Sequence, residues 1–198
     1  MPSGDWVGYY DRQRDRDPRA LLLQALASFE REGRVGKAVD IGAGQGFETA
    51  ELLRRGWEVE AIDAQEEGIR RLRERAGEAG GRLRTIVSRM EDTDVPAADL
   101  VHASFSLPFC PPAAFPSLWE RIRSALRPGA RFVGELFGDR DTWASTEPEM
   151  TFVNEAQARA LFDRLVLESF EEEESEDEGW GDESKHWHVF HAIARLPG

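Results

Sequence analysis

Residues 39–46, Val-Asp-Ile-Gly-Ala-Gly-Gln-Gly, are the part of the sequence best suited to binding chemistry. Glycine adopts positive φ angles and lets the backbone approach a bound molecule closely, so this segment predicts a ligand-binding turn. Its GxGxG spacing is one residue shorter than the GxGxxG turn that holds a dinucleotide pyrophosphate, which argues against an NAD-dependent enzyme. Asp40, just before the turn, suits a ligand with an ammonium group better than one with phosphates.

A second acidic residue, Asp63, follows 23 residues after Asp40. It ends the next predicted strand, where a carboxylate can accept hydrogen bonds from both hydroxyls of a ribose. The glycine turn and Asp63 together therefore indicate a ligand that contains a ribose.

Strand and helix patterns alternate along the chain. Strands are expected at residues 37–41, 57–62, 83–87, 99–103 and 130–137, with an antiparallel pair at 165–170 and 187–194. Helices are expected from the N-cap Asp17 and Pro18 to Gly33, and at residues 47–55, 65–76, 118–126 and 154–162. This order predicts an α/β fold: one doubly wound Rossmann-like sheet, mostly parallel with a C-terminal antiparallel hairpin, and helices on both faces. Ligands of such sheets bind beyond the carboxyl ends of the strands, and residues 138–150 are expected to cover the site.

Length and composition limit the function further. The 198 residues predict one domain, with an N-terminal aromatic arm and helix at residues 1–36 and the core at residues 37–198. With a net charge of -13 and no long apolar run, neither nucleic acid nor a membrane is an expected partner. Nine acidic residues lie in residues 171–183, where mutual repulsion predicts a mobile loop. The single cysteine, Cys110, and the absence of a secretion-signal pattern favour the cytoplasm.

Over residues 21–137 the chain resembles the class I S-adenosylmethionine-dependent methyltransferases of the small-molecule type, including the tellurite-resistance branch. The resemblance implies S-adenosylmethionine as cofactor and S-adenosylhomocysteine as product. It implies that the methionine part meets the glycine turn, the ribose meets Asp63 and the adenine meets Ala64. The residues implied to bind the cofactor are Trp6, Tyr10, Asp40, Gly42, Ala43, Gly44, Gly46, Asp63, Ala64, Met90, Glu91, Ala103 and Ser104. Arg89 stands where the family often has an aspartate that meets the adenine.

The acceptor side is less defined. Phe105 and Trp143 are expected to line it, because the end of the fourth strand and the loop at 138–150 should meet at the carboxyl edge of the sheet. His186 and His188 share one face of an extended segment and are the candidate catalytic bases, since histidine takes up protons near neutral pH. Spacing places no third ligand beside them, so no metal is expected.

These observations predict transfer of a methyl group from S-adenosylmethionine to a small-molecule nucleophile, an O, N, S or chalcogen acceptor, by in-line displacement. Two alternatives stay open: a non-catalytic S-adenosylmethionine-binding protein and, less favoured by the glycine spacing, an NAD-dependent enzyme on a related fold. A monomer or a homodimer is expected.

Overall fold

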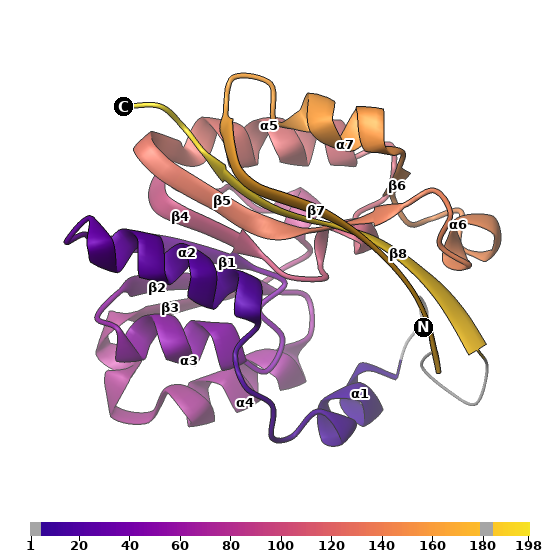
Figure 1. The fold of residues 1–198 in the computed structure, drawn as a ribbon. Coiled ribbons are helices and arrows are strands. Elements are labelled where there is room, and N and C mark those ends of the chain that lie inside the picture. Colours follow the sequence, from indigo (N-terminus) through magenta and orange to yellow (C-terminus); the bar gives the residue numbers. More distant parts are fainter. Residues whose placement is uncertain (1–4, 179–183) are drawn as a thin grey trace.

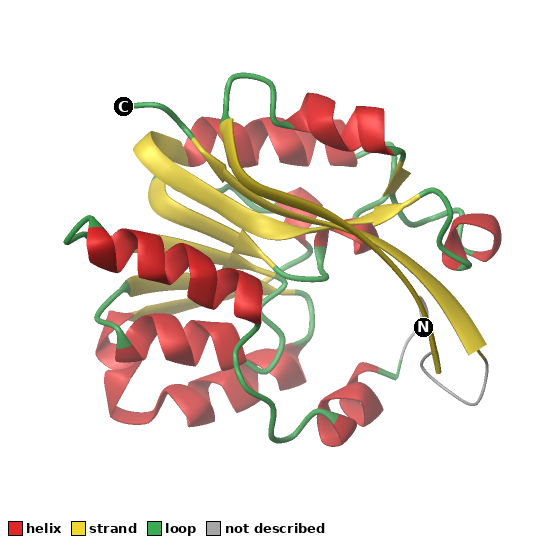
Figure 2. Ribbon diagram, viewed as in Figure 1, coloured by secondary structure: helices red, strands yellow, loops and turns green. Residues whose placement is uncertain are grey.

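The computed structural model describes residues 5–178 and 184–198. Within these residues, the strands form one sheet in the order β3-β2-β1-β4-β5-β8-β7, and the short β6 pairs with β5. β1 to β5 run parallel, β8 is antiparallel to β5, and β7 is antiparallel to β8. Helices cover both faces of this twisted sheet (Figures 1 and 2).

The strands and helices have the following bounds. The strands are β1 (Lys37–Ile41), β2 (Glu58–Asp63), β3 (Leu83–Val87), β4 (Ala98–Ala103), β5 (Leu126–Gly138), β6 (Phe152–Val153), β7 (Val166–Glu178) and β8 (Ser184–Arg195). The α-helices are α1 (Trp6–Arg12), α2 (Ala20–Arg31), α3 (Phe47–Arg54), α4 (Glu66–Ala76), α5 (Phe115–Ala125), α6 (Trp143–Thr146) and α7 (Glu155–Leu161). Short 3-10 helices are η1 (Gly77–Arg82), η2 (Met90–Asp92) and η3 (Leu107–Phe109). In the part of the chain described, no helix has the length and apolar character needed to cross a membrane.

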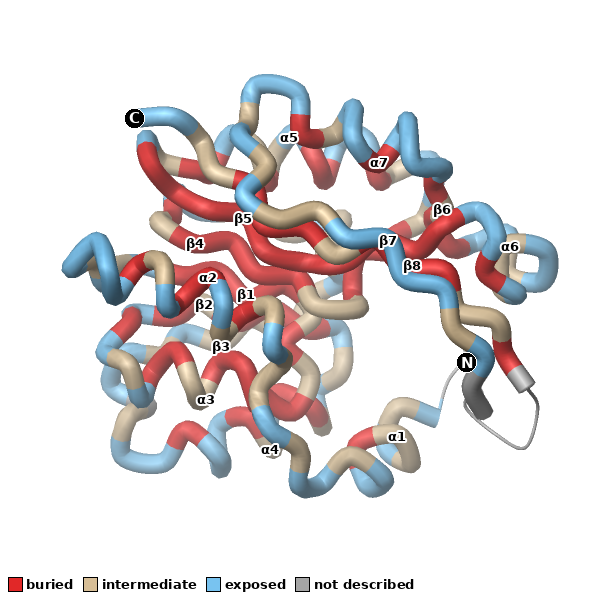
Figure 3. The backbone as a smooth tube through the Cα atoms, in the orientation of Figure 1, coloured by how far each residue is buried: buried red, intermediate tan, exposed pale blue. Residues whose placement is uncertain are grey.

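Two hydrophobic cores lie on opposite faces of the sheet, and the central strands are buried between them (Figure 3). Ala38 and Leu100 belong to the core beneath α2, α3 and α4, whereas Val39 and Val101 belong to the core beneath α5 and α7. Side chains alternate across a strand, so the next residues, Asp40 and His102, return to the α2–α3 face. This alternation brings two polar side chains to the carboxyl end of the central strands.

The predicted fold class is confirmed: the sheet is mostly parallel, carries an antiparallel C-terminal hairpin and has helices on both faces. Two details at the N-terminus differ. The arm contains a helix, α1, whose N-cap Asp5 accepts a hydrogen bond from the backbone N–H of Gly8. The prediction that α2 begins at Asp17 and Pro18 was wrong, because it begins at Ala20 after an extended Arg19.

The reason for this late start is a contact with α3. Glu48 of α3 accepts hydrogen bonds from the Arg16 guanidinium, at 2.6 and 2.8 Å, and from the backbone N–H of Arg19, at 3.2 Å. These bonds hold the segment before α2 extended along α3. The division into an arm at 1–36 and a core at 37–198 stays a prediction.

The acidic segment was predicted to be a mobile loop, and for residues 171–178 this was wrong. They continue β7 and pair with β8 as far as Glu178 opposite Ser184. Cations offset their repulsion: the Arg140 guanidinium donates to Glu172 and to Glu174, at 2.5 Å each, and β8 contributes three histidines that contact β7 carboxylates. Residues 179–183, the rest of the predicted loop, lie outside the described residues.

We expect the β7–β8 hairpin to weaken as pH rises. A hydrogen bond to Glu176 raises the pKa of His186. Burial lowers the pKa of His191, but Glu135 and Glu173 outweigh it, so the net shift is upward. A pKa raised by folding adds stability below the unfolded value of about 6.5, and this stability is lost as pH rises through the folded pKa.

Thermal unfolding followed by circular dichroism from about pH 6 to about pH 9 would measure this effect. The melting temperature should fall with pH, and it should fall less in a His186→Gln/His191→Gln double variant. Equal slopes for the two proteins would show that these histidines do not contribute.

Candidate functional site

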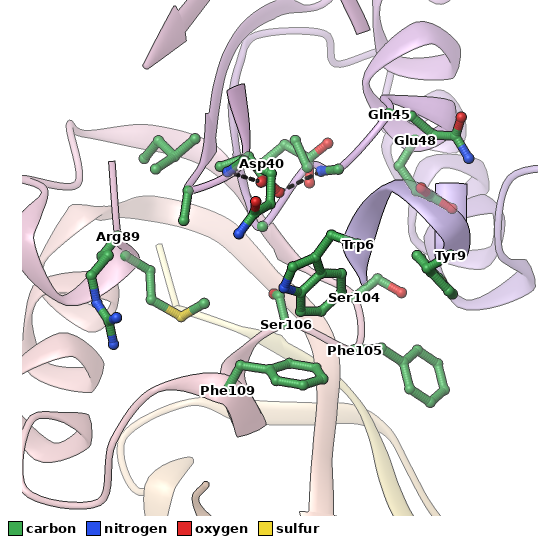
Figure 4. Close-up of a pocket in the computed structure, with 18 of the residues that line it drawn as sticks. Trp6, Tyr9, Asp40, Gln45, Glu48, Arg89, Ser104, Phe105, Ser106 and Phe109 are labelled. Atoms are coloured by element: carbon green, nitrogen blue, oxygen red, sulfur yellow. Dashed lines mark hydrogen bonds between the residues drawn. The ribbon is translucent and has the colours of Figure 1, made fainter. Parts of the chain in front are cut away.

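A cavity of about 470 Å³ lies at the carboxyl ends of β1, β2 and β4. Its walls come from α1, the glycine turn after β1, the end of β2, the turn after β3 and the segment after β4 (Figure 4). Cavities of roughly 300–1,000 Å³ are typical of small-molecule and cofactor sites. The cavity therefore lies where the sheet topology predicts a ligand.

Most of the predicted binding residues line this cavity. They are Trp6, Tyr10, Asp40, Gly42, Ala43, Gly44, Asp63, Ala64, Met90, Glu91 and Ser104, with the predicted substrate residue Phe105. Five predicted residues are absent from the lining: Gly46, Ala103, Trp143, His186 and His188. The structure thus gathers the predicted cofactor residues at one place and sets the predicted bases apart from them.

The three glycines of the turn have different tasks. All are left-handed, with φ of 71° at Gly42, 54° at Gly44 and 80° at Gly46. A Cβ on Gly42 would lie 2.2 Å from the Ser106 Cβ, and one on Gly46 would lie 2.4 Å from the Leu72 Cγ. On Gly44 it would meet only the Tyr10 ring, at 3.5 Å. Gly42 and Gly46 therefore serve packing, while Gly44 keeps the cavity wall open.

This difference predicts that Gly44→Ala separates binding from folding. Alanine in the left-handed conformation would cost about 1–2 kcal/mol of unfolding free energy. Its methyl group would also project into the space where the ligand approaches the backbone of the turn. We expect at least a tenfold loss of S-adenosylhomocysteine affinity by calorimetry, about 1.4 kcal/mol, with cooperative unfolding preserved. Gly46→Ala is the matched variant and should lose more stability, because its Cβ meets the core. Normal affinity in Gly44→Ala would remove the turn from the site.

Asp63 joins the glycine turn to β2. Its Oδ2 accepts from the backbone N–H of Gly44 and its Oδ1 from that of Gln65, both at 2.7 Å. Burial raises the pKa of this carboxyl, the two backbone donors lower it, and the charge of Asp40 raises it further. A carboxylate fixed in this way at the cavity wall retains acceptor capacity for the hydroxyls of a ribose.

Asp40 and His102 form a buried pair in the same wall. They are register partners on the parallel strands β1 and β4, and His102 Nδ1 lies 2.8 Å from Asp40 Oδ1. The hydroxyl of Thr49 on α3 donates to the other oxygen, Asp40 Oδ2, at 2.5 Å. Both Asp40 oxygens are therefore engaged by the protein itself.

Helix α1 closes the cavity from outside the sheet. The Gln45 side-chain amide donates to the backbone carbonyls of Tyr10 and Gln13, at 3.1 and 2.8 Å, and so ties the end of α1 to the glycine turn. At the other end of α1 the Trp6 ring meets the edge of Phe109, with centroids 5.2 Å apart. Figure 4 shows the Trp6 ring next to that of Phe109. The aromatic residues of α1 thus contribute a wall that could exclude water.

The end of β4 is conformationally strained. Phe105 has a left-handed φ of 49°, which is uncommon for a residue with a side chain. Its backbone N–H donates to the buried carboxylate of Glu135 at 3.1 Å, and the Arg19 guanidinium lies 4.1 Å above its ring. The adjacent Ser104 hydroxyl is buried and has no hydrogen-bond partner in the described structure. Strain and unpaired polar atoms concentrate at functional sites, which favours this strand end as part of one.

The predicted bases His186 and His188 do not reach the cavity. His186 Nδ1 and Nε2 lie 2.7 and 2.9 Å from carboxylates of β7. His188 is fully buried, with Nδ1 accepting from the Arg140 backbone N–H and Nε2 2.9 Å from Glu172. Of the four histidines in the chain, only His102 lines the cavity. β8 directs this pair toward β7 and the loop after β5, and a catalytic role for the pair stays a prediction.

Trp143 also lies outside the cavity. Its ring and that of Trp187 flank the buried Lys185 ammonium, whose Nζ is 4.1 and 3.7 Å from the two ring centroids. Lys185 forms an ion pair with Asp141, which lies in the same loop as Trp143. Residues 138–150 were expected to cover the site, but only Glu149 and Met150 of this loop line the cavity. No residue of α6 lines it.

One group of side chains in the described residues could in principle hold a metal ion: Glu172, Glu174 and His188. The Arg140 guanidinium already lies on both carboxylates, at 2.5 Å, and supplies the positive charge there. These carboxylates therefore already have a cationic partner in Arg140.

Sequence reasoning missed several residues of the cavity, above all Glu48, Arg19 and His102. A signal for His102 was present: it and Asp40 are both the next-to-last residue of a central strand, and such positions on parallel strands face the same side. Glu48 and Arg19 come together only through the packing of the segment before α2 on α3, which leaves no local pattern.

Comparison with known proteins adds to this geometry. Residues 38–129 match a family model described as a methyltransferase domain. Comparison with curated protein sequences found no match.

Solved structures with this fold include TehB from Haemophilus influenzae, with a TM-score of 0.79 and 14% identity. That match covers 95% of this chain and 65% of TehB, so the chain spans less than two thirds of its length. The 1,6-didemethyltoxoflavin-N1-methyltransferase of Burkholderia thailandensis, with bound 1,6-didemethyltoxoflavin and S-adenosylhomocysteine, has a TM-score of 0.66 and 23% identity, over 98% of this chain and 86% of that one. The N-methyltransferase NodS from Bradyrhizobium japonicum, in complex with S-adenosylhomocysteine, has a TM-score of 0.68 and 18% identity, over 94% and 91%. Residues 38–129 are thus similar to a methyltransferase domain, and the chain shares its fold with methyltransferases that bind S-adenosylhomocysteine.

Proposed function

We propose that the protein transfers a methyl group from S-adenosylmethionine to a small-molecule nucleophile. The observation that carries this proposal is the single cavity wall formed by Gly44, Asp63 and Asp40, continuous with an aromatic wall from α1 and the segment after β4. The left-handed glycine turn and the carboxylate held beside it fit a ligand with a ribose and an ammonium group. We also propose that the protein acts in the cytoplasm, as a monomer or a homodimer.

The residues that would hold the cofactor follow from their places in the cavity. Asp63 would accept the ribose hydroxyls, Ala64 and Met90 would flank the adenine, and Asp40 would face the ammonium group. Of the arginines that line the cavity, Arg16 and Arg89 are paired with Glu48 and Glu91, whereas Arg19 has no carboxylate partner among the described residues and could take an anionic group.

When bound, S-adenosylmethionine supplies a methyl group made electrophilic by the sulfonium that carries it. The task of the protein is then to align the acceptor with that methyl group and to exclude water. Alignment of reactants can contribute roughly 7 to 11 kcal/mol to the rate. Trp6 and Phe109 would exclude water, and Ser104 and Phe105 would position the acceptor. No side chain is required to remove a proton unless the acceptor binds in its protonated form.

Charge and shape favour a small acceptor. The cavity lies beneath α1, and the net charge of -13 opposes binding of nucleic acid. The 1,6-didemethyltoxoflavin-N1-methyltransferase acts on a small molecule, as its name states, and NodS is an N-methyltransferase; both share the fold. A heteroaromatic or amine nitrogen is therefore a reasonable first acceptor to test, beside O, S and chalcogen nucleophiles.

The experiment is a product assay. The protein is incubated with S-adenosylmethionine and a panel of small amines, heteroaromatics, phenols, thiols, selenite and tellurite, and S-adenosylhomocysteine is measured. We expect at least one class to give product above the blank, and the Asp63→Ala variant to give much less at the same limiting concentration of S-adenosylmethionine. Tight binding of S-adenosylhomocysteine without transfer to any class would favour the non-catalytic alternative.

A further inference from the structure

His102 and Asp40 form a buried polar pair on the central strands of the sheet. Each side chain is at most 3% exposed, and the opening left to the imidazole is toward the cavity that it lines. Asp40 Oδ1 lies 2.8 Å from His102 Nδ1, and Oδ2 takes the Thr49 hydroxyl. The carboxylate thus fixes the imidazole with its Nδ1–H toward β1, as in other Asp–His pairs, and leaves Nε2 as the nitrogen that can gain or lose a proton.

Carboxylates outnumber guanidinium groups around this pair, which favours a protonated imidazole. The charged groups that surround the pair are Asp40 of β1, Asp63 at the end of β2, Glu48 of α3, Glu135 of β5, and Arg16 and Arg19 from the segment before α2. Arg16 makes a bidentate ion pair with Glu48 and so compensates it. Burial lowers the pKa of His102, but the charge and hydrogen bond of Asp40, helped by Glu48 and Glu135, outweigh it and hold that pKa above its usual value.

A ligand that carries an ammonium group would bring a second positive charge to Asp40. Two positive charges close together in a cavity of low dielectric repel each other strongly, and only one of them can have Asp40 as its counter-ion. Loss of one proton from the imidazole removes the repulsion and leaves the hydrogen bond from Nδ1–H to Asp40 in place.

We propose that His102 and Asp40 form a proton-linked counter-ion for the ammonium group of the cofactor. When that group enters the cavity, the Nε2–H bond of His102 breaks, the proton goes to solvent, and the Asp40 carboxylate becomes the partner of the ammonium group. His102 is a positioning residue in this scheme, because it acts on the cofactor through Asp40. The proposal rests on the cofactor alone and is independent of the acceptor.

Two measurable consequences follow from linkage. Binding of S-adenosylhomocysteine, which keeps the ammonium group, should release about one proton near neutral pH. Its affinity should rise by up to about tenfold per pH unit below the pKa of His102 in the free protein and then become constant. 5′-Methylthioadenosine, which has the nucleoside and thioether but no amino acid, should release no proton and bind independently of pH.

Calorimetry in buffers of different ionisation enthalpy gives the number of protons released. We expect about one for the unmodified protein and near zero for His102→Asn, whose amide can still donate to Asp40 but cannot titrate. The matched control is His186→Asn on the hairpin, which should release the same number as the unmodified protein. The proposal is overturned by no release in the unmodified protein, by undiminished release in His102→Asn, or by equal release with 5′-methylthioadenosine.

A second measurement needs no substitution at His102. The ring protons of the four histidines can be followed by NMR during addition of S-adenosylhomocysteine, with those of the β8 histidines identified from single asparagine variants. One remaining ring, that of His102, should change from the charged to the neutral chemical shift, while 5′-methylthioadenosine leaves it charged. A His102 ring that keeps its charge with both ligands would refute the proposal even if the His102→Asn variant does not fold.

Discussion

Replacing Asp63 with alanine is expected to lower the affinity for S-adenosylhomocysteine by about 2 to 4 kcal/mol, roughly 30- to 1,000-fold. The variant removes the acceptor for the ribose hydroxyls from the cavity wall. It also releases the backbone N–H groups of Gly44 and Gln65, which Asp63 holds at 2.7 Å, and so loosens the glycine turn. Calorimetric titration of the two proteins under the same conditions measures the difference.

A control on the same strand separates this effect from damage to β2. Glu60 is three residues away, lies outside the cavity and pairs with Arg84 at the surface. Glu60→Gln should bind S-adenosylhomocysteine as the unmodified protein does. Equal affinities for Asp63→Ala and Glu60→Gln, with both folded by circular dichroism, would mean that Asp63 is not part of the cofactor site.

The part of the site that could be predicted from the sequence depends on local geometry. A strand that ends in a glycine turn, followed by a helix and a second strand that ends in Asp63, places its parts by connections only a few residues long. The parallel pairing of β1 with β2 then brings Asp63 beside Gly44. The positions of the glycine turn and Asp63 therefore depend on a short stretch of sequence, and for this reason the two could be predicted together.

The acidic half of β7 could not be predicted in this way. Repulsion between neighbouring carboxylates was a sound local argument, but their cations come from far along the chain: Arg140 is 32 residues from Glu172 and 34 from Glu174. The histidines of β8 approach only after the hairpin has formed. We therefore expect deletion of residues 171–176 to destabilise the protein, contrary to the expectation for a mobile loop.

The histidines illustrate the same limit at the site. His186 and His188 share a strand face, which made them a visible pair, whereas His102 stands alone in a predicted strand. Their tasks are decided by which strand lies beside them: β7 with its carboxylates beside β8, and β1 with Asp40 beside β4. Strand order is a property of the whole sheet, so the sequence pattern of a single strand could not distinguish these cases.

The largest effect on stability is expected for Lys185→Met. Lys185 and Asp141 form an ion pair in which the side chains are 3% and 0% exposed. The rings of Trp143 and Trp187 flank the Lys185 ammonium group. Burial lowers the pKa of Lys185, and Asp141 acts in the opposite direction. Methionine would fill the aromatic enclosure but leave Asp141 buried without its partner. Loss of one member of a buried pair costs about 3–5 kcal/mol of unfolding free energy.

The chain offers a matched control, because its other lysine, Lys37, pairs with Glu58 at 3.5 Å at the surface. Lys37→Met should change the unfolding free energy by less than about 1 kcal/mol. A double variant, Lys185→Met with Asp141→Asn, should recover part of the loss, since the amide oxygen can still accept from the Trp143 backbone N–H without leaving a charge unpaired. Chemical denaturation of the four proteins tests this. A loss below about 1 kcal/mol in Lys185→Met would contradict a stabilising buried pair.

Binding distinguishes this position from the cofactor site. Lys185 contacts the loop after β5, and that loop contributes only Glu149 and Met150 to the cavity, away from Gly44 and Asp63. Lys185→Met should therefore keep the affinity for S-adenosylhomocysteine, measured well below its lowered melting temperature, within about twofold of the unmodified protein. A parallel loss of cofactor affinity and stability would instead couple the hairpin to the glycine turn, and the two halves of the sheet would have to be treated as one binding unit.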